Sequence, residues 1–278
     1  MKNKKFIFGF ILGILVMGTT AYAAYKYQAK EVGYTPSNEN FKVDNVEDAI
    51  EELYQKQVGP TYVVLNTGET HKGIVYLDPT DLTKKCIASN SVSTTETKTG
   101  CMKWYVFIDD ANKNEYTMIL DHNTTATTNW NSNNDNTDPS EINAEVLKLV
   151  SDYGWKITPR LITAQEIADI ANVSWSGNTT YRLGTGTDVD YSKMTSEQQV
   201  KQRSYHWLFD YTKNCTNYGG SVADPSTAGY WTSTPVSAYP TRTYLMSYEA
   251  RLDHGNTNGV NGNYGIRPVI TISKSIIK

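Results

Sequence analysis

The sequence is poor in the residues on which most enzymes and nucleic-acid-binding proteins depend. Its 278 residues include only three cysteines and four histidines, and 20% are charged. The net charge is −3, and the basic residues are scattered, so the basic stripe typical of nucleic-acid binding is missing. The sequence also has no G-x-S-x-G, H-E-x-x-H, P-loop or C-x-x-C motif. We therefore expect neither a nucleic-acid partner nor an enzyme of these motif classes.

Metal and cofactor sites are not predicted either. His71, His122, His206 and His254 lie far apart, and none has a Cys or His neighbour at ligand spacing. The segment 133–138 is rich in side-chain oxygens, as calcium loops are, but it lacks their spacing and their closing Glu. A solvated loop is expected there, and a structural calcium stays unsupported.

The residues that are abundant point to a displayed surface. Tyrosine dominates the aromatic residues, with 20 copies against six of phenylalanine and six of tryptophan. Asn, Thr, Ser and Gly separate short apolar runs. This composition is typical of a loop-rich, surface-displayed protein rather than of a cytosolic helical enzyme.

The N-terminal segment, residues 1–24, predicts a signal peptide or membrane anchor. Lys2, Lys4 and Lys5 precede an apolar run, and an A-x-A cleavage site ends at Ala23. We interpret it as a secretory signal cleaved after Ala23. The alternative is an uncleaved anchor at 6–25, about the 20 residues that span a bilayer. Both interpretations place the rest of the chain outside the cytoplasm, with membrane contact only through this segment.

Residues 25–59 are predicted to form a spacer with one amphipathic helix at about 45–57. Val46, Ile50, Leu53 and Tyr54 have the spacing of one helix face. A single helix this short cannot bury its apolar stripe alone. It therefore either packs on the main body or forms a neck that pairs between chains.

Residues 60–278 are predicted to form one α+β domain. Runs of β-branched and aromatic residues predict strands at 61–65, 73–77, 104–108, 116–120, 228–236, 242–252 and 265–277. Pro268 cannot donate to a ladder, so it should begin the last strand or lie on an edge. One helix is predicted after an N-cap at Ser140, with the apolar stripe Ile142, Val146, Leu149, Val150 and Tyr153. Another is predicted over 196–211, with Val200, Trp207, Leu208 and Tyr211 on one face.

The segment PRLITAQEIADI at 159–170 specifies a helix start unusually tightly. Thr163 and Glu166 form a T-x-x-E capping box, and Ile162 and Ile167 occupy the two positions of a hydrophobic staple. Two independent local devices thus predict the same first turn.

The cysteines agree with an exported chain. Cys86 and Cys101 flank a polar loop, and a disulfide between them would close about 15 residues and contribute roughly 3 kcal/mol. Cys215 is left over, either as an unpaired thiol or as a reactive nucleophile.

Three segments, PRLITAQEIADI, GYWTSTPV and GIRPVITI, follow one another in a characteristic order. In this order they resemble the C-type-lectin-like fold of the formylglycine-generating-enzyme (sulfatase-modifying factor) superfamily. The likeness covers about residues 62–278, and it also extends to exported single-domain proteins of Gram-positive gut bacteria. The resemblance implies short twisted antiparallel strands, two to three helices and long loops.

The resemblance also implies roles for individual residues. The framework positions would be Arg160, Thr163, Glu166, Trp231 and Arg267, with the two arginines paired to buried carboxylates or carbonyls. The enzymes of this superfamily hold copper with two cysteines late in the domain. This chain has only Cys215 there, so the resemblance does not carry over that activity.

A surface signal remains between residues 231 and 264. Tyrosines, asparagines and arginines are interleaved with Gly and Ser there, a composition typical of binding surfaces. The candidate ligand-binding residues are Trp231, Tyr239, Arg242, Tyr244, Tyr248, Arg251, Asp253, His254, Asn256, Asn258 and Asn263. The alternative is that the tyrosines pack a sheet while the asparagines fill turns.

Three functions are therefore open from sequence. The first is a non-catalytic, surface-exposed module that binds a glycan or protein ligand at the cell surface through its C-terminal loops. The second is a structural surface protein with an oligomeric helical neck. The third is a copper oxidase of the formylglycine-generating type that uses Cys215.

Overall fold

The computed structural model divides into two compact units, residues 1–58 and 59–278. It describes residues 59–277 except 64–68, 91–95, 178, 214, 221–226 and 260–262, and before residue 59 it describes only Val46, which is helical. The predicted signal or anchor segment and the rest of the predicted 45–57 helix lie outside these residues. Within the described ranges, no helix is long and apolar enough to span a bilayer.

The first sheet contains five antiparallel strands in the order β1-β2-β3-β4-β10. They are β1 (Thr61–Val63), β2 (Gly73–Leu77), β3 (Met102–Asp110), β4 (Glu115–Leu120) and β10 (Val269–Ser273). Every residue of β2 is buried, as expected for a continuous apolar run in a sheet covered on both faces. Pro268 directly precedes the edge strand β10, where its missing N–H costs no ladder bond.

The second sheet has the order β5-β8-β7-β6-β9. Its strands are β5 (Tyr181–Arg182), β6 (Gly229–Pro235), β7 (Arg242–Ser247), β8 (Arg251–Asn256) and β9 (Tyr264–Gly265). The expectation of purely antiparallel pairing is wrong at one edge, because β9 runs parallel to β6. Gly265 is required there, since a Cβ would lie 2.0 Å from the Thr125 carbonyl oxygen.

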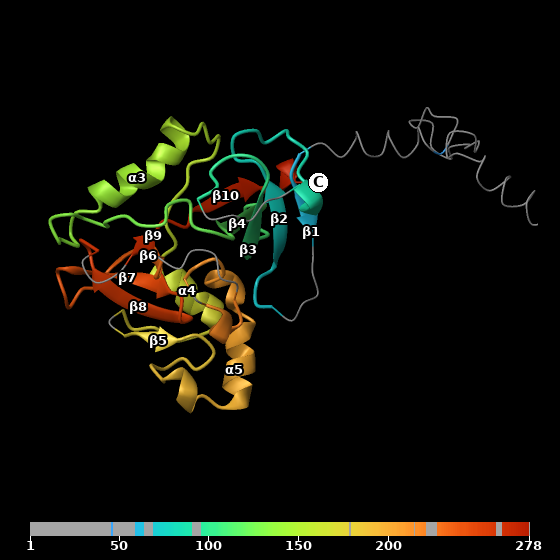
Figure 1. Ribbon diagram of the computed structural model, residues 1–278. Coiled ribbons are helices and arrows are strands. Elements are labelled where there is room, and N and C mark those ends of the chain that lie inside the picture. Colours follow the sequence, from blue (N-terminus) through green and yellow to red (C-terminus); the bar gives the residue numbers. More distant parts are fainter. Residues whose placement is uncertain are drawn as a thin grey trace, which may run out of the picture. The chain divides into compact units, whose positions relative to one another are not determined.

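Three α-helices accompany the two sheets in the described part of the chain, so the fold class is α+β, as predicted. They are α3 (Ser140–Ser151), α4 (Ala164–Ala171) and α5 (Ser196–Arg203). Short 3-10 turns connect the elements: η2 (Ala88–Asn90), η3 (Tyr191–Lys193), η4 (His206–Leu208), η5 (Thr216–Tyr218) and η6 (Lys274–Ile276). Figure 1 shows the two sheets as separate groups of arrows, with α5 beside the second.

The helix α4 begins as the sequence predicts. Thr163 accepts a hydrogen bond from the Glu166 amide, and the Glu166 carboxylate accepts one from the Thr163 amide. Ile162 and Ile167 are both fully buried in the same apolar cluster. Arg160 binds the Glu166 carboxylate through both terminal nitrogens, at 2.6 and 2.8 Å. The capping box therefore also anchors the preceding arm.

Two predicted helices differ in detail. Ser140 is the first helical residue of α3 rather than its N-cap, and Asp138 accepts the Ser140 amide instead. Val150 and Tyr153 are exposed, because the buried stripe of α3 contains only Ile142, Val146 and Leu149. These three residues share one helix face, since they are spaced at i, i+4 and i+7.

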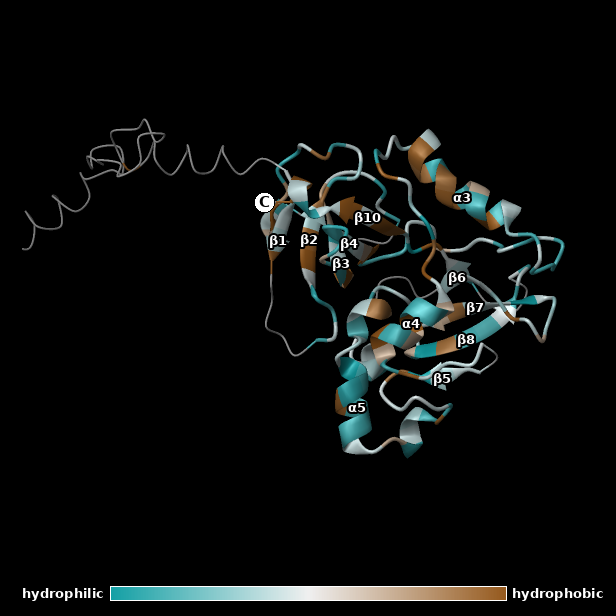
Figure 2. Ribbon diagram, turned by 180° about the vertical axis from the view of Figure 1, so that it is seen from behind, coloured by the Kyte–Doolittle hydropathy of each residue, from teal (hydrophilic) through white to brown (hydrophobic). Residues whose placement is uncertain are grey.

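The helix predicted over 196–211 is wrong in its second half. α5 ends at Arg203. Trp207 and Leu208 belong instead to the 3-10 turn η4, and both of their side chains are buried. Val200 is 69% exposed, and Figure 2 shows α5 mostly hydrophilic. Tyr211 has a φ of +55°, which a continuing helix does not allow.

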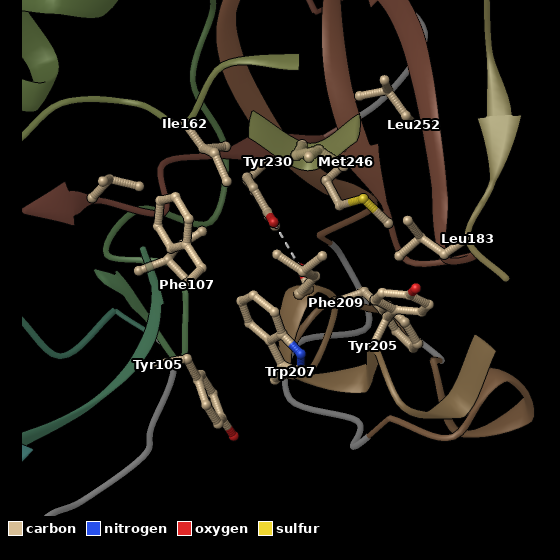
Figure 3. Close-up of a cluster of buried hydrophobic side chains, with 14 of the residues drawn as sticks. Tyr105, Phe107, Ile162, Leu183, Tyr205, Trp207, Phe209, Tyr230, Met246 and Leu252 are labelled. Atoms are coloured by element: carbon tan, nitrogen blue, oxygen red, sulfur yellow. Dashed lines mark hydrogen bonds between the residues drawn. The ribbon is translucent and has the colours of Figure 1, made fainter. Parts of the chain in front are cut away.

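The main apolar cluster joins the two sheets. Tyr105 and Phe107 of β3 meet Tyr230 of β6 and Met246 of β7, with Trp207 and Phe209 among them (Figure 3). The Tyr230 hydroxyl donates to the Leu208 carbonyl at 2.7 Å, which satisfies this polar atom inside the cluster. A second cluster covers the other face of the first sheet and includes Leu149 and Trp155. The sheets thus share one core.

The predicted disulfide between Cys86 and Cys101 is present, with a Cα–Cα distance of 5.4 Å. Cys215, the third cysteine, is a buried thiol. Burial, together with the charge of Asp210, raises the pKa of this thiol to about 11. A group of this kind stays protonated at neutral pH, which does not suit a nucleophile.

Candidate functional site

The register of the second sheet divides the predicted ligand-binding residues between two faces. Arg242 and Tyr244 of β7 lie opposite Asn256 and His254 of β8, so these four residues share one face. Arg251 and Asp253 lie on the other face, because side chains alternate along a strand.

Two of the predicted residues lie inside the protein. Trp231 is fully buried beside Leu245, and its indole N–H donates to the Thr128 carbonyl at 2.8 Å. Tyr244 is also fully buried as a residue, and its hydroxyl donates to the Gly177 carbonyl at 3.2 Å. Their role in this structure is to pack the sheet.

Five side chains form a contiguous group at one end of β7 and β8, here named the Tyr239 cluster. Its members are Trp175, Tyr239, Arg242, Tyr244 and His254. The His254 ring lies 5.7 Å from the Tyr239 ring and 6.1 Å from the Tyr244 ring, while the Trp175 ring lies 5.1 Å from the Tyr244 ring. The Arg242 guanidinium stacks 5.1 Å from the centre of the Tyr239 ring. The cluster therefore joins aromatic faces to one permanent cation.

The exposed member, Tyr239, lies on the β6–β7 connection. Its side chain is 48% exposed, whereas Trp175, Arg242 and His254 are half-buried. Asn136 holds this connection by donating hydrogen bonds of 2.7 to 3.0 Å to the carbonyls of Val236, Tyr239 and Arg242. A loop anchored in this way loses little conformational entropy on binding, so the cluster is preorganised.

A groove of about 400 Å³ adjoins the same connection. It is lined by Trp130, Asn136, Thr137, Pro139, Ser233, Pro235, Ser237 and Pro240. Prolines and a tryptophan give the groove an apolar wall, and the hydroxyl and amide groups give it hydrogen-bonding atoms. No member of the Tyr239 cluster lines this groove, and Pro235 pairs with Thr243 on the sheet face opposite Arg242 and Tyr244, so the groove and the cluster are separate features.

The other predicted residues are dispersed around the second sheet. Arg251 forms ion pairs with Asp188 at 2.6 Å and with Asp253 at 3.3 Å, on the face opposite His254. Tyr248 lies under the Lys213 ammonium, which is 5.0 Å from its ring centre. Asn256, on the Tyr244 face, ends β8, and Asn258 and Asn263 follow in the β8–β9 connection.

Sequence reasoning missed Trp175 and a partly buried polar group. Trp175 stands in the Gly/Ser/Asn loop after α4, where an isolated tryptophan is the only signal. The polar group is here named the Glu69 network and contains the buried His71 and Asp210 with the half-buried Glu69 and His206. Two histidines separated by 135 residues in sequence thus meet at one carboxylate.

The Glu69 network is continuous. The Glu69 carboxylate contacts His71 Nε2 at 2.5 Å and His206 Nε2 at 2.9 Å, and His206 Nδ1 contacts Asp210 at 2.7 Å. Burial favours the neutral form of each group. At His71 burial outweighs the attraction of Glu69, so the pKa of His71 is lowered. At His206 the two carboxylates outweigh burial and raise the pKa to about 9. Burial acts to raise the pKa of Glu69, but pairing with His206 and His71 outweighs burial and lowers this pKa.

Arg267 is a second polar group of the interior, whereas the calcium-like segment 133–138 is mostly exposed or half-buried. Arg267 is fully buried, donates to the carbonyls of Trp207 and Asp210, and stacks 4.7 Å from the Tyr230 ring. Within the calcium-like segment, Asp135 accepts from the Thr137 amide and hydroxyl at 2.8 Å. In the described ranges, no three His, Cys, Asp or Glu side chains are grouped to hold a metal ion.

The comparisons with known proteins found no relative. No family model, curated protein or solved structure matches the chain. Function is therefore inferred from the side chains of this chain alone.

Proposed function

We propose that this chain is an exported, surface-exposed, non-catalytic binding module that contacts its ligand through the exposed and half-buried members of the Tyr239 cluster, with the buried Tyr244 supporting them. The observation that carries this proposal is the grouping of aromatic rings with one arginine on a preorganised connection. Tyr and Trp offer large contact areas with few rotatable bonds, and Arg, Tyr and Trp are the residues enriched at binding hot spots.

The proposed fold is the C-type-lectin-like fold of the sulfatase-modifying-factor superfamily. Two features support it: the two-sheet α+β architecture, and the positions of Arg160, Glu166 and Arg267. These residues hold the arm before α4 and the segment after η4, so they act as framework. The proposed ligand surface lies on β7, β8 and the β6–β7 connection.

Export is proposed from the N-terminal segment and from the disulfide. Disulfides such as Cys86–Cys101 persist in oxidising compartments. The chain would then display its second unit outside the cytoplasm, either secreted or anchored by residues 6–25.

The copper-oxidase alternative has little support. A copper thiolate needs a deprotonated cysteine, and the burial of Cys215 raises its pKa. The two-cysteine pattern of the superfamily enzymes is also incomplete in this sequence. The helical-neck alternative concerns residues outside the described ranges.

A binding experiment tests the proposal directly. The full-length chain is applied to a glycan array and a protein array beside its Tyr239→Ala and Trp175→Ala variants. Each variant should weaken retention of the same ligand by about tenfold or more, because hot-spot truncation costs about 2 kcal/mol. Tyr153→Ala is a matched control, since this tyrosine is 40% exposed beyond α3.

Stability must be measured together with binding. Tyr239 is largely exposed, so Tyr239→Ala should change the melting temperature little. If both cluster variants retain every ligand as strongly as the Tyr153→Ala control, the Tyr239 cluster is not the binding surface.

A further inference from the structure

Among the described residues, Arg242 lacks the acidic partner that three other arginines of this domain have. Arg160, Arg182 and Arg251 each pair with a carboxylate, and Arg267 is neutralised by carbonyl oxygens. Among the residues that the structure describes, Arg242 forms no ion pair. Its charge is instead held by the Tyr239 ring and by His254, whose Nδ1 lies 3.3 Å from an Arg242 terminal nitrogen. An arginine fixed in this way is ready to receive an anion.

The contact with Arg242 also determines the proton position on His254. A guanidinium can only donate hydrogen bonds, so His254 Nδ1 must accept. The neutral ring therefore carries its proton on Nε2. This N–H points away from the guanidinium and is free to donate to a ligand hydroxyl, while the planar fork of Arg242 suits the two oxygens of a carboxylate.

The surroundings of Arg242 favour a compact ligand. Tyr239 is the one largely exposed apolar side chain on the second sheet and its connections within the described ranges; the others lie on β3, on or just after α3, and on α5. Stable protein interfaces bury about 800 Å² on each partner around an apolar core. One tyrosine with a half-buried tryptophan is small for such a core, but it suits the apolar face of a sugar ring.

We propose that the Tyr239 cluster binds a carboxylate-bearing sugar, a hexuronic acid or a sialic acid. The carboxylate is bound by the Arg242 guanidinium, and the sugar ring lies against Tyr239. This inference rests on the proposed function, and it adds the chemical class of the ligand.

The test measures binding of the full-length chain to matched acidic and neutral sugars by calorimetry. Sialyllactose is compared with lactose, and digalacturonic acid with digalactose, so the two sources of carboxylate are distinguished. We expect one acidic sugar to bind at least tenfold more tightly than its neutral counterpart. Arg242→Gln should remove this preference, since hydrogen bonds to charged groups are worth about tenfold or more. Arg242→Lys should restore part of it, because it keeps the charge and loses the planar fork.

The control variant is Arg203→Gln, which makes the same change on an exposed residue of α5. It should bind like the unmodified chain. Equal binding of acidic and neutral sugars, or an acidic preference that Arg242→Gln leaves intact, overturns the inference. Retention of a protein or a neutral glycan that Tyr239→Ala abolishes would also overturn it, while leaving the proposed function standing. If no array ligand depends on Tyr239 or Trp175, both proposals fail.

Discussion

Folding stability is expected to fall with rising pH because of His206. This side chain is 27% exposed and lies between the carboxylates of Glu69 and Asp210. Burial alone would lower its pKa, but the hydrogen bonds and charges of Asp210 and Glu69 raise it to about 9 from an unfolded value of 6.5. The folded state therefore binds more protons than the unfolded state between these two values. This stabilisation is complete below pH 6.5 and is lost as the pH rises through 9.

The magnitude follows from the size of the pKa difference. One pKa unit corresponds to about 1.4 kcal/mol, and partial solvent screening reduces the sum, so we expect a loss of about 2–3 kcal/mol. This is a large share of the about 5–15 kcal/mol by which domains are stable. It should be visible as a lower urea midpoint at pH 10 than at pH 6.

The assay compares urea unfolding of the full-length chain and of His206→Gln at pH 6, 8 and 10. Groups that do not contact His206 or its partners ionise alike in both proteins, so the change of this difference with pH reports His206 and the groups of the Glu69 network coupled to it. This difference should shrink by about 2–3 kcal/mol between pH 6 and pH 10. A difference that stays constant across this range would refute the charged His206 bridge.

Two further predictions concern α4 and the buried thiol. Thr163→Ala should lower the free energy of unfolding by about 1 kcal/mol, because it removes the oxygen that accepts the Glu166 amide. Thr163→Ser should recover most of this loss in thermal unfolding, and a serine variant as unstable as the alanine variant would contradict the capping role. Burial raises the pKa of Cys215 to about 11, so the folded chain should resist iodoacetamide at pH 8 and react only after unfolding in guanidinium. Rapid labelling of the folded chain would show that the thiol is accessible.

Features set by near neighbours could be predicted from the sequence. The capping box of Thr163 and Glu166 spans three residues, and its atoms meet as soon as one helical turn forms. The strand runs are similarly local, since alternating or continuous apolar residues select extended backbone. The disulfide joins Cys86 and Cys101, which are 15 residues apart, and the polar loop between these two cysteines indicated the pairing.

Features that depend on which surface is covered could not be predicted in the same way. Val150 belongs to the apolar side of α3 by spacing, but the core contacts only Ile142, Val146 and Leu149. The tyrosine-rich segment presents the same difficulty. Tyr239 and Tyr244 lie five residues apart, yet one is 48% exposed and the other fully buried. Strand register and the position of the main apolar cluster, rather than residue type, separate them.

The sequence by itself determined many local elements of this protein: the strands β1 to β4 and β6, the start of α4, the disulfide and the position of Pro268 before an edge strand. It did not show β5 or the turn that divides the predicted strand 242–252 into β7 and β8. Only the tertiary structure decided which distant side chains meet. It places His71 and His206 on Glu69, and it brings Trp175 against Tyr244. The physical reason is range: helix caps and strand patterns arise from neighbouring residues, whereas a site arises only when sheet register and core packing bring separate segments together.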